Sequence, residues 1–267
     1  MVDLPQTETL KLERDAEWLT IRLDRPDTRN ALSQEMVEEL LTLLGTVRGD
    51  QSLRGITFRG NNGVFCSGGD LKGFLQTMKA DDARQEIVRA SRQGGELFAA
   101  IDCLPQVVLM LVEGAAIAGG LGMICAGDAV FVTEDAQFAL TETMIGIPPA
   151  QIAPYVARRL GLKVARRIML TAARFNGKEA VEFGLADRVV ANADAFAELE
   201  ADFRKAVLRC APGANATTKE LLLAAMHLDG ADMTGLAAER FADSLLGEEA
   251  REGISSFLEK RKPRWAE

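Results

Sequence analysis

The spacing of apolar and polar residues changes along the chain, and these changes predict alternating strands and helices. Residues 19–24 alternate, which is typical of a half-buried strand, and residues 25–27 predict the turn that ends it. Residues 53–58 predict a second strand. Between them, Ser33 is a predicted N-cap for a helix whose apolar positions have helical spacing: Met36, Leu40, Leu43, Leu44 and Val47.

The central part of the chain continues this order. Residues 84–101 predict a long helix with a polar face, and residues 107–112 are continuously apolar, as expected of a strand buried on both faces. A helix is predicted over 121–126 and a strand over 129–132. The succession of strands, turns and helices favours an α/β core.

From about residue 176 onward the pattern is mostly helical. A helix over 177–183 is predicted to end at Gly184, before a short strand over 187–190. No linker, low-complexity tract or internal repeat is visible. The last seventy or so residues carry apolar positions at helical spacing: Leu221, Leu222, Ala225, Leu245, Leu246, Ile254 and Leu258.

Composition and charge exclude several classes of protein. The 267 residues are 48% hydrophobic, enough for a sizeable core, and the net charge of −8 argues against a nucleic-acid binder. The four cysteines have no CxxC spacing, which predicts free thiols and a reducing compartment. No export signal, transit signal or membrane-spanning run is visible, so a cytoplasmic protein is expected.

Two glycine pairs about fifty residues apart are the most informative local feature. Gly68-Gly69 and Gly119-Gly120 each follow an apolar, strand-like run. Glycine allows the main chain to approach a ligand closely and to adopt positive φ without steric cost, so paired glycines at strand ends suit hydrogen-bond donation from the backbone. Two such N–H groups could hold one oxyanion, for example that of a thioester carbonyl.

The order and spacing of several segments carry a resemblance to a known family. These segments are 25–32, 65–72, 112–123, 136–142 and 257–263. Together they resemble the crotonase (enoyl-CoA hydratase/isomerase) superfamily along almost the whole chain. The resemblance implies an α/β crotonase-like spiral of ββα units over residues 1–193. It further implies a C-terminal helical region over residues 194–267 that assembles trimers, often paired into hexamers.

The resemblance also implies catalytic groups. In this family two backbone N–H groups hold the carbonyl oxygen of an acyl-CoA, and the matching positions are Gly69 and Gly119. A helix beginning at Gly119 would add the positive end of its dipole. Glu142 matches a catalytic glutamate of the family, and its apolar neighbours predict a raised pKa, as suits a general acid or base near neutrality.

The implied acyl-CoA site uses the segments around the first glycine pair. Ser67 and Leu71 would present backbone groups to the adenine, with Asp70 between them in the same binding segment. Ala31 and Leu32 would line the entry to the pantetheine channel. Coenzyme A is part of the substrate, and no metal or separate cofactor is expected. The candidate partners of the phosphates are Arg25, Lys72 and Lys260. Phe257 is expected to bind beside Lys260, and both residues come either from the same chain or from a neighbouring subunit.

The chain departs from the hydratase pattern at Gly122, where hydratases with two catalytic glutamates carry the other one. Glycine here, together with residues 140–156, looks most like hydratases of glutaconyl-type thioesters, such as methylglutaconyl-CoA or isohexenylglutaconyl-CoA. Such substrates carry a second carboxylate. The basic residues of the following helix that could pair with it are Lys79, Arg84, Arg89 and Arg92.

The leading hypothesis is therefore an acyl-CoA lyase that adds water to a 2-enoyl-CoA, favouring a branched or carboxylated acyl chain. An isomerase or decarboxylase of the same fold, and a non-catalytic acyl-CoA-binding protein, are the alternatives. His227 is the only histidine, which argues against a Ser/His/Asp triad and against a metal site built from histidines. Cys66 has no neighbouring base and is interpreted as a small buried filler.

Overall fold

A six-stranded sheet forms the centre of the computed structural model, which describes residues 2–266. Its strand order is β1-β2-β3-β4-β6-β9. β1 and β2 are antiparallel, and every other neighbouring pair is parallel. The strands are β1 (Leu10–Asp15), β2 (Trp18–Leu23), β3 (Gly55–Gly60), β4 (Val107–Val112), β6 (Ala129–Thr133) and β9 (Arg188–Val190).

A second, three-stranded sheet has the order β5-β7-β8. Its strands are β5 (Ala115–Ile117), β7 (Gln137–Ala139) and β8 (Phe175–Asn176). β5 and β7 are parallel, whereas β7 and β8 are antiparallel. The chain passes from β4 to β5 and from β6 to β7, so it alternates between the two sheets and winds as a spiral.

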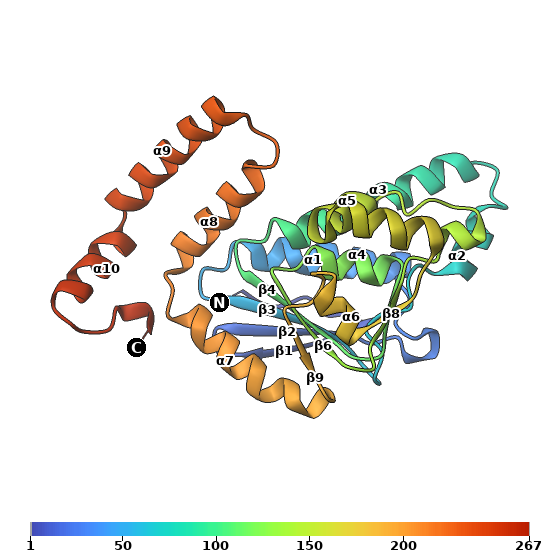
Figure 1. The fold of residues 1–267 in the computed structure, drawn as a ribbon, viewed down its shortest axis with the longest axis horizontal. Coiled ribbons are helices and arrows are strands. Elements are labelled where there is room, and N and C mark those ends of the chain that lie inside the picture. The colour runs from blue at the N-terminus through green and yellow to red at the C-terminus, as the bar shows by residue number, and fades with distance from the viewer. Residues whose placement is uncertain (1, 267) are drawn as a thin grey trace.

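Helices cover both faces of the large sheet. One side carries α1 (Gln34–Arg48), α3 (Ala83–Asp102), α4 (Gly119–Cys125) and α5 (Ala153–Thr171), and α7 (Phe196–Leu208) covers the other (Figure 1). Their apolar faces fill two hydrophobic clusters, the smaller of which joins Phe196 and Val207 of α7 to Phe131 of β6. The shorter helices are α2 (Leu71–Thr77), α6 (Gly177–Glu182), η1 (Pro26–Thr28), η2 (Glu142–Ile145), η3 (Ala193–Ala195) and η4 (Arg264–Ala266).

The last three long helices form an arm that extends away from the sheet (Figure 1). This C-terminal arm consists of α8 (Pro212–Ala224), α9 (Gly230–Leu246) and α10 (Glu248–Leu258), and Ser256 is the one buried residue of these helices. Two cations tie the arm and the tail that follows it to the core. Lys219 Nζ donates to the Gln106 carbonyl at 2.7 Å, and the buried Arg54 guanidinium donates to the carbonyls of Cys210 and Trp265.

Most predicted elements are confirmed. The Ser33 side chain accepts the Met36 N–H at 3.2 Å and begins α1, and the strand over 107–112 is β4, buried at all but its first residue. The strand predicted from Leu53 begins instead at Gly55, where the Trp18 ring covers the glycine. Within residues 2–266 no helix combines the length and the apolar character needed to cross a lipid bilayer.

The exposed apolar face of the arm predicts self-association. Phe241 is 69% exposed, Leu246 71% and Leu258 74%, and water contact with these side chains is unfavourable. We expect sedimentation velocity to show three or six subunits, and Leu246→Glu to shift the distribution toward smaller species because it places a charge on this face. A parent protein that sediments as a monomer at micromolar concentration would refute the prediction.

Candidate active site

The two glycine pairs lie in turns that contact one another. A Cβ atom at Gly68 would lie 3.0 Å from the Ala118 Cβ and 3.1 Å from the Ile117 carbonyl oxygen. Gly68 also has φ +101°, a conformation that side chains disfavour, so glycine is required here for both space and backbone geometry. Residues about fifty positions apart are thereby placed in direct contact.

Backbone hydrogen bonds hold the strands that lead into these turns. Cys66 and Ala116 form a parallel bridge, in which the Cys66 N–H donates to the Ala115 carbonyl and the Ile117 N–H donates to the Cys66 carbonyl, both at 2.9 Å. Leu32 and Gly69 form another parallel bridge. The positions of the two turns are therefore set by main-chain pairing.

Two N–H groups at these turns are left unpaired. Among residues 2–266, neither the Gly69 N–H nor the Gly119 N–H has a hydrogen-bond acceptor, and Gly119 is the first residue of α4. The Leu32 side chain borders one of them, because a Cβ at Gly119 would lie 2.9 Å from Leu32 Cδ1. Free N–H groups in a mostly apolar setting are suited to hold a carbonyl oxygen.

The Phe74 side chain borders the other free N–H group, and the sequence analysis missed it. A Cβ at Gly69 would lie 2.9 Å from two atoms of the Phe74 ring, although the ring is 45% exposed. Phe74 lies on α2, which the sequence analysis did not predict as a helix. The only available signal was the apolar residue four positions after Asp70, which is the N-cap of α2.

Glu142 reaches the same region through the pairing of β5 with β7. Ile117 and Ala139 are register partners, and the Ala118 N–H donates to the Ala139 carbonyl at 2.9 Å. Gly119 and Glu142 therefore lie just beyond the carboxyl ends of two adjacent parallel strands, the edge at which α/β sheets commonly bind ligands. Glu142 begins η2.

The Glu142 carboxyl group is buried without a partner. The residue is 8% exposed, and neither carboxylate oxygen accepts a hydrogen bond from residues 2–266. Burial raises the pKa of Glu142, because the charged form loses its hydration. The raised pKa agrees with the prediction made from the apolar neighbours.

The predicted coenzyme A segments lie together around the first turn. Arg25 donates to the Ala31 carbonyl at 2.9 Å and lies 3.9 Å from the Asp70 carboxylate. Asp70 also accepts the Lys72 N–H at 3.1 Å. The Leu71 N–H and the Ser67 carbonyl have no partner among residues 2–266, so both could serve a ligand.

Phe257 and Lys260 are not part of this cluster within one chain. Phe257 lies in the last turn of α10 in the arm and is 82% exposed, whereas α2 lies at the opposite end of the molecule (Figure 1). Lys260 follows α10 and has φ +56°. Within one chain, these two side chains therefore lie away from the predicted coenzyme A segments.

The position of Gly122 is enclosed by apolar side chains. A Cβ at Gly122 would lie 3.0 Å and 3.1 Å from two Ile152 side-chain atoms and 3.3 Å from the Phe98 ring. These contacts are tighter than ordinary van der Waals packing. The structure therefore has no open space for the larger side chain that two-glutamate hydratases would place here.

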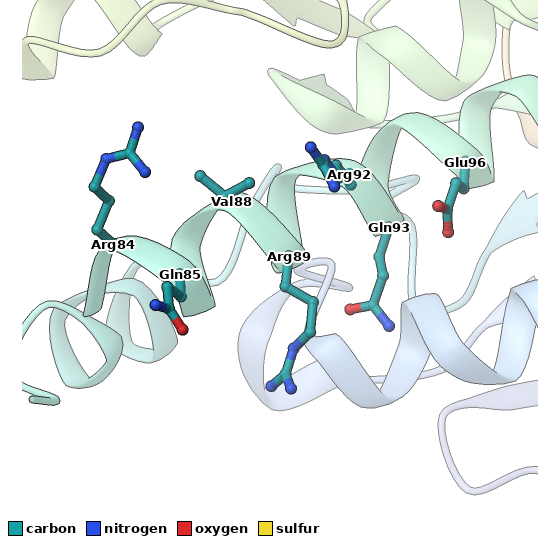
Figure 2. A pocket seen from close by; sticks show the side chains of 7 residues that line it. All are labelled: Arg84, Gln85, Val88, Arg89, Arg92, Gln93 and Glu96. Carbon is teal, nitrogen blue, oxygen red and sulfur yellow. The ribbon is translucent and has the colours of Figure 1, made fainter. Parts of the chain in front are cut away.

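The basic residues of α3 border a hollow of about 290 Å³ that extends from Arg84 to Glu96. The Arg84 and Arg89 side chains project from opposite sides of the helix (Figure 2). Arg89 forms an ion pair with Glu86, whereas Arg84, Arg92 and Lys79 have no ion pair among residues 2–266. A larger cavity of about 980 Å³ lies between α7 and the C-terminal tail, and no predicted site residue lines it.

Comparison with known proteins identifies the family. A family model described as "Enoyl-CoA hydratase/isomerase" matches residues 13–267. The chain belongs to this family. Its crotonase-like α/β fold, with a helical region at the C-terminus, is confirmed by similarity to solved structures.

Individual relatives match over most of their length. AtuE of Pseudomonas aeruginosa is 44% identical, with a TM-score of 0.93 over 97% of this chain and 100% of that one. An enoyl-CoA hydratase/isomerase from Marinobacter aquaeolei is 36% identical, with a TM-score of 0.93 over 97% and 99% of the two chains. Mouse "Enoyl-CoA hydratase domain-containing protein 2, mitochondrial" is 32% identical over 92% of this chain and 83% of its own.

The enclosure of Gly122 predicts that this family member cannot accept a second glutamate there. We expect Gly122→Glu to lower the melting temperature more than Gly122→Ala, because it adds both volume and a buried carboxyl group. Differential scanning calorimetry measures both changes. In an Ile152→Ala background, which lacks both contacting Ile152 atoms, Gly122→Ala should cost less stability than it does in the parent protein. Unchanged stability of Gly122→Glu would show that the space exists.

The buried carboxyl group of Glu142 predicts a pH-dependent stability difference. A carboxyl whose folded-state pKa lies above the ordinary 4.5 contributes stability that is fully present below that value and is lost as pH rises through the folded-state pKa. Glutamine does not ionise, so Glu142→Gln should melt above the parent at neutral pH. This advantage should shrink toward acid pH. The exposed Glu182, replaced by Gln, is the control, and a difference independent of pH would contradict the prediction.

Proposed function

We propose that the chain is an acyl-CoA lyase that adds water to the double bond of a 2-enoyl-CoA. The observation that carries the proposal is the unpartnered Glu142 carboxylate beside two unpaired backbone N–H groups, Gly69 and Gly119. Buried polar groups are normally hydrogen-bonded, so the buried Glu142 carboxylate without a partner, near two free N–H groups that are half-buried, indicates a place prepared for a ligand. Membership of the enoyl-CoA hydratase/isomerase family supports an acyl-CoA substrate.

The proposed reaction needs one carboxylate and one oxyanion hole. The thioester carbonyl accepts hydrogen bonds from the Gly69 and Gly119 N–H groups, which draws electrons from the double bond. A water molecule attacks the β-carbon while Glu142 takes one of its protons, and an enolate forms. Protonated Glu142 then returns that proton to the α-carbon. The hydroxyl group and both hydrogens are thereby accounted for, with no other cofactor in the proposal.

The raised pKa of Glu142 serves both steps. A carboxylate with an ordinary pKa is a weak base toward water and rarely carries a proton near neutrality. A group whose pKa lies closer to the working pH exchanges a proton in both directions more readily. The same apolar surroundings that leave Glu142 without a hydrogen-bond partner therefore provide the required acid–base behaviour.

The coenzyme A portion is proposed to bind around the first turn. Arg25, already held by Ala31 and Asp70, and Lys72 are placed to meet its phosphates, with the Ser67 carbonyl and Leu71 N–H available to the adenine. We further propose a trimer or a pair of trimers, in which Phe257 and Lys260 of a neighbouring subunit complete this site. The four free cysteines support a reducing, cytoplasmic location.

A branched or carboxylated, glutaconyl-type acyl chain is the proposed substrate class. Gly122 removes the second carboxylate, so no negative side chain at that position repels a substrate carboxylate. Arg84 and Arg92 have no ion pair among residues 2–266 and could pair with such a group, whereas Arg89 is paired with Glu86. An enoyl-CoA isomerase or decarboxylase is the second candidate, because a single carboxylate suffices to move a proton along an enolate.

Glu142→Gln tests the proposal. It keeps the size of the side chain but cannot exchange a proton, so kcat should fall by roughly 10²–10⁴ while acyl-CoA binding stays nearly intact. A panel of 2-enoyl-CoA thioesters, including crotonyl-CoA and 3-methylglutaconyl-CoA, would be incubated in ¹⁸O water and examined by mass spectrometry. Label in the product identifies hydration, and an unlabelled product of unchanged mass that separates from the substrate by chromatography identifies isomerisation.

The controls separate chemistry from folding. Circular dichroism and sedimentation should be the same for Glu142→Gln and the parent protein. Full hydration by Glu142→Gln would show that the base lies elsewhere. Tight binding of acyl-CoA by the parent protein without conversion of any thioester would favour a non-catalytic acyl-CoA-binding protein.

A further inference from the structure

The buried Cys66 side chain contacts both glycine turns. Its Sγ accepts the Gly68 N–H at 3.4 Å. On the other side, a Cβ at Gly120 would lie 2.8 Å from the Cys66 Cβ and 3.2 Å from Sγ, so the first turn of α4 packs directly against this residue. Gly69 and Gly119 are each adjacent in sequence to a glycine that Cys66 touches.

The Cys66 backbone adds a third connection. Its N–H and its carbonyl both pair with the strand that ends at Ile117, through hydrogen bonds to Ala115 and from Ile117. The residue is fully buried, and burial raises the pKa of its thiol to about 12. The sulfur is therefore a neutral group of fixed size that does not serve as a nucleophile.

We propose that Cys66 is a positioning residue that sets the spacing and orientation of the Gly69 and Gly119 N–H donors. The inference rests on the proposed function, since it assumes that these two groups form the oxyanion hole. The sulfur accepts the hydrogen bond of the Gly68 N–H, so the Gly69 N–H remains the free donor of the first turn. Its bulk against Gly120 fixes how closely α4 approaches that turn.

Removing the sulfur would disturb both effects. The buried Gly68 N–H would lose its acceptor, which is unfavourable, and would turn toward another one. Because Gly68 precedes Gly69, such a rotation changes the direction of the neighbouring donor. The gap left beside Gly120 would also allow α4 to shift. A misplacement of about 1 Å in a catalytic geometry costs roughly a hundredfold in rate, so a smaller shift should cost about tenfold.

The other buried thiol supplies a matched control. Cys125 ends α4, is 3% exposed, and has a pKa that burial likewise raises to about 12. Cys125→Ala removes the same atom from the core at the other end of α4, and Cys125 is not among the closest contacts of either glycine pair. Cys66→Ser, which keeps an acceptor at a shorter reach, is the conservative variant. Should Cys66→Ala fail to fold, Cys66→Val, which fills the space without a good acceptor, takes its place.

The experiment tests the oxyanion hole by the absorption spectrum of a bound thioester and by the turnover rate. A conjugated thioester such as 2,4-hexadienoyl-CoA absorbs at longer wavelength when its carbonyl is polarised, and the Glu142→Gln background would keep it from reacting. In that background we expect Cys66→Ala to lose much of the red shift, with Cys66→Ser between it and the parent. With native Glu142, kcat for crotonyl-CoA should fall about tenfold in Cys66→Ala at little-changed KM, whereas Cys125→Ala keeps both values.

Two outcomes would overturn the inference, and they can be told apart. If Cys66→Ala melts at a lower temperature but keeps the full red shift and kcat, Cys66 only packs the core. If hexadienoyl-CoA binds to the Glu142→Gln protein without any red shift, the oxyanion hole itself is wrong, and the proposed function fails together with the role of Cys66.

Discussion

The parallel pairing of backbone at two short bridges is the constraint on which the candidate site depends. Leu32 pairs with Gly69, and Cys66 pairs with Ala116. These hydrogen bonds bring three distant segments of the chain to one place. They also satisfy the neighbouring backbone groups and leave the Gly69 and Gly119 N–H groups without an acceptor among residues 2–266. A hydrogen-bond donor that the fold itself does not use costs stability, and such a donor is available to a substrate.

The Glu142 carboxyl group shows the same relation between stability and chemistry. Its oxygens are buried and unpartnered, and its charged form is disfavoured where it lies. Another buried carboxyl group, that of Asp50, is well satisfied. Asp50 accepts hydrogen bonds from Ser52 and Arg14. The hydrogen bond from the Ser52 side chain is the main reason why the pKa of Asp50 lies well below the ordinary value. The contrast between the two carboxyl groups is the reason why Glu142, and not Asp50, is the candidate for acid–base chemistry.

In the proposed assembly, the C-terminal arm would connect the core of one chain to the site of another. Arg54 and Lys219 anchor it through backbone carbonyls, while its apolar side chains remain exposed. Phe257 and Lys260 lie on or beyond this arm, far from α2 (Figure 1). The proposed site would therefore couple assembly to substrate binding, because a neighbouring subunit would contribute its arm.

Local pattern in the sequence was sufficient to predict much of this protein. Hydrophobic period predicted α1, α3 and β4, with Ser33 as the N-cap of α1, whereas the selection of Glu142 came from the family resemblance, and its catalytic role and those of the glycine pairs remain predictions. These features depend on neighbouring residues, which a linear pattern records. The edge strand β1 and the helix α5, whose Gly161 has φ +71°, were missed, since their patterns are short or interrupted. The division of the chain at residue 193 and the trimer remain predictions.

Contacts between distant segments were decided only by the tertiary structure. No sequence pattern indicates that Ile152 and Phe98 close the space beside Gly122, or that Phe74 lies against Gly69. Cys66 was interpreted from the sequence as a simple filler, yet the fold places it between both turns. The sequence shows only which chemical groups a glycine or a cysteine contributes at a given position. Which atoms meet depends on how strands far apart in the chain pair, and that pairing is a property of the whole fold.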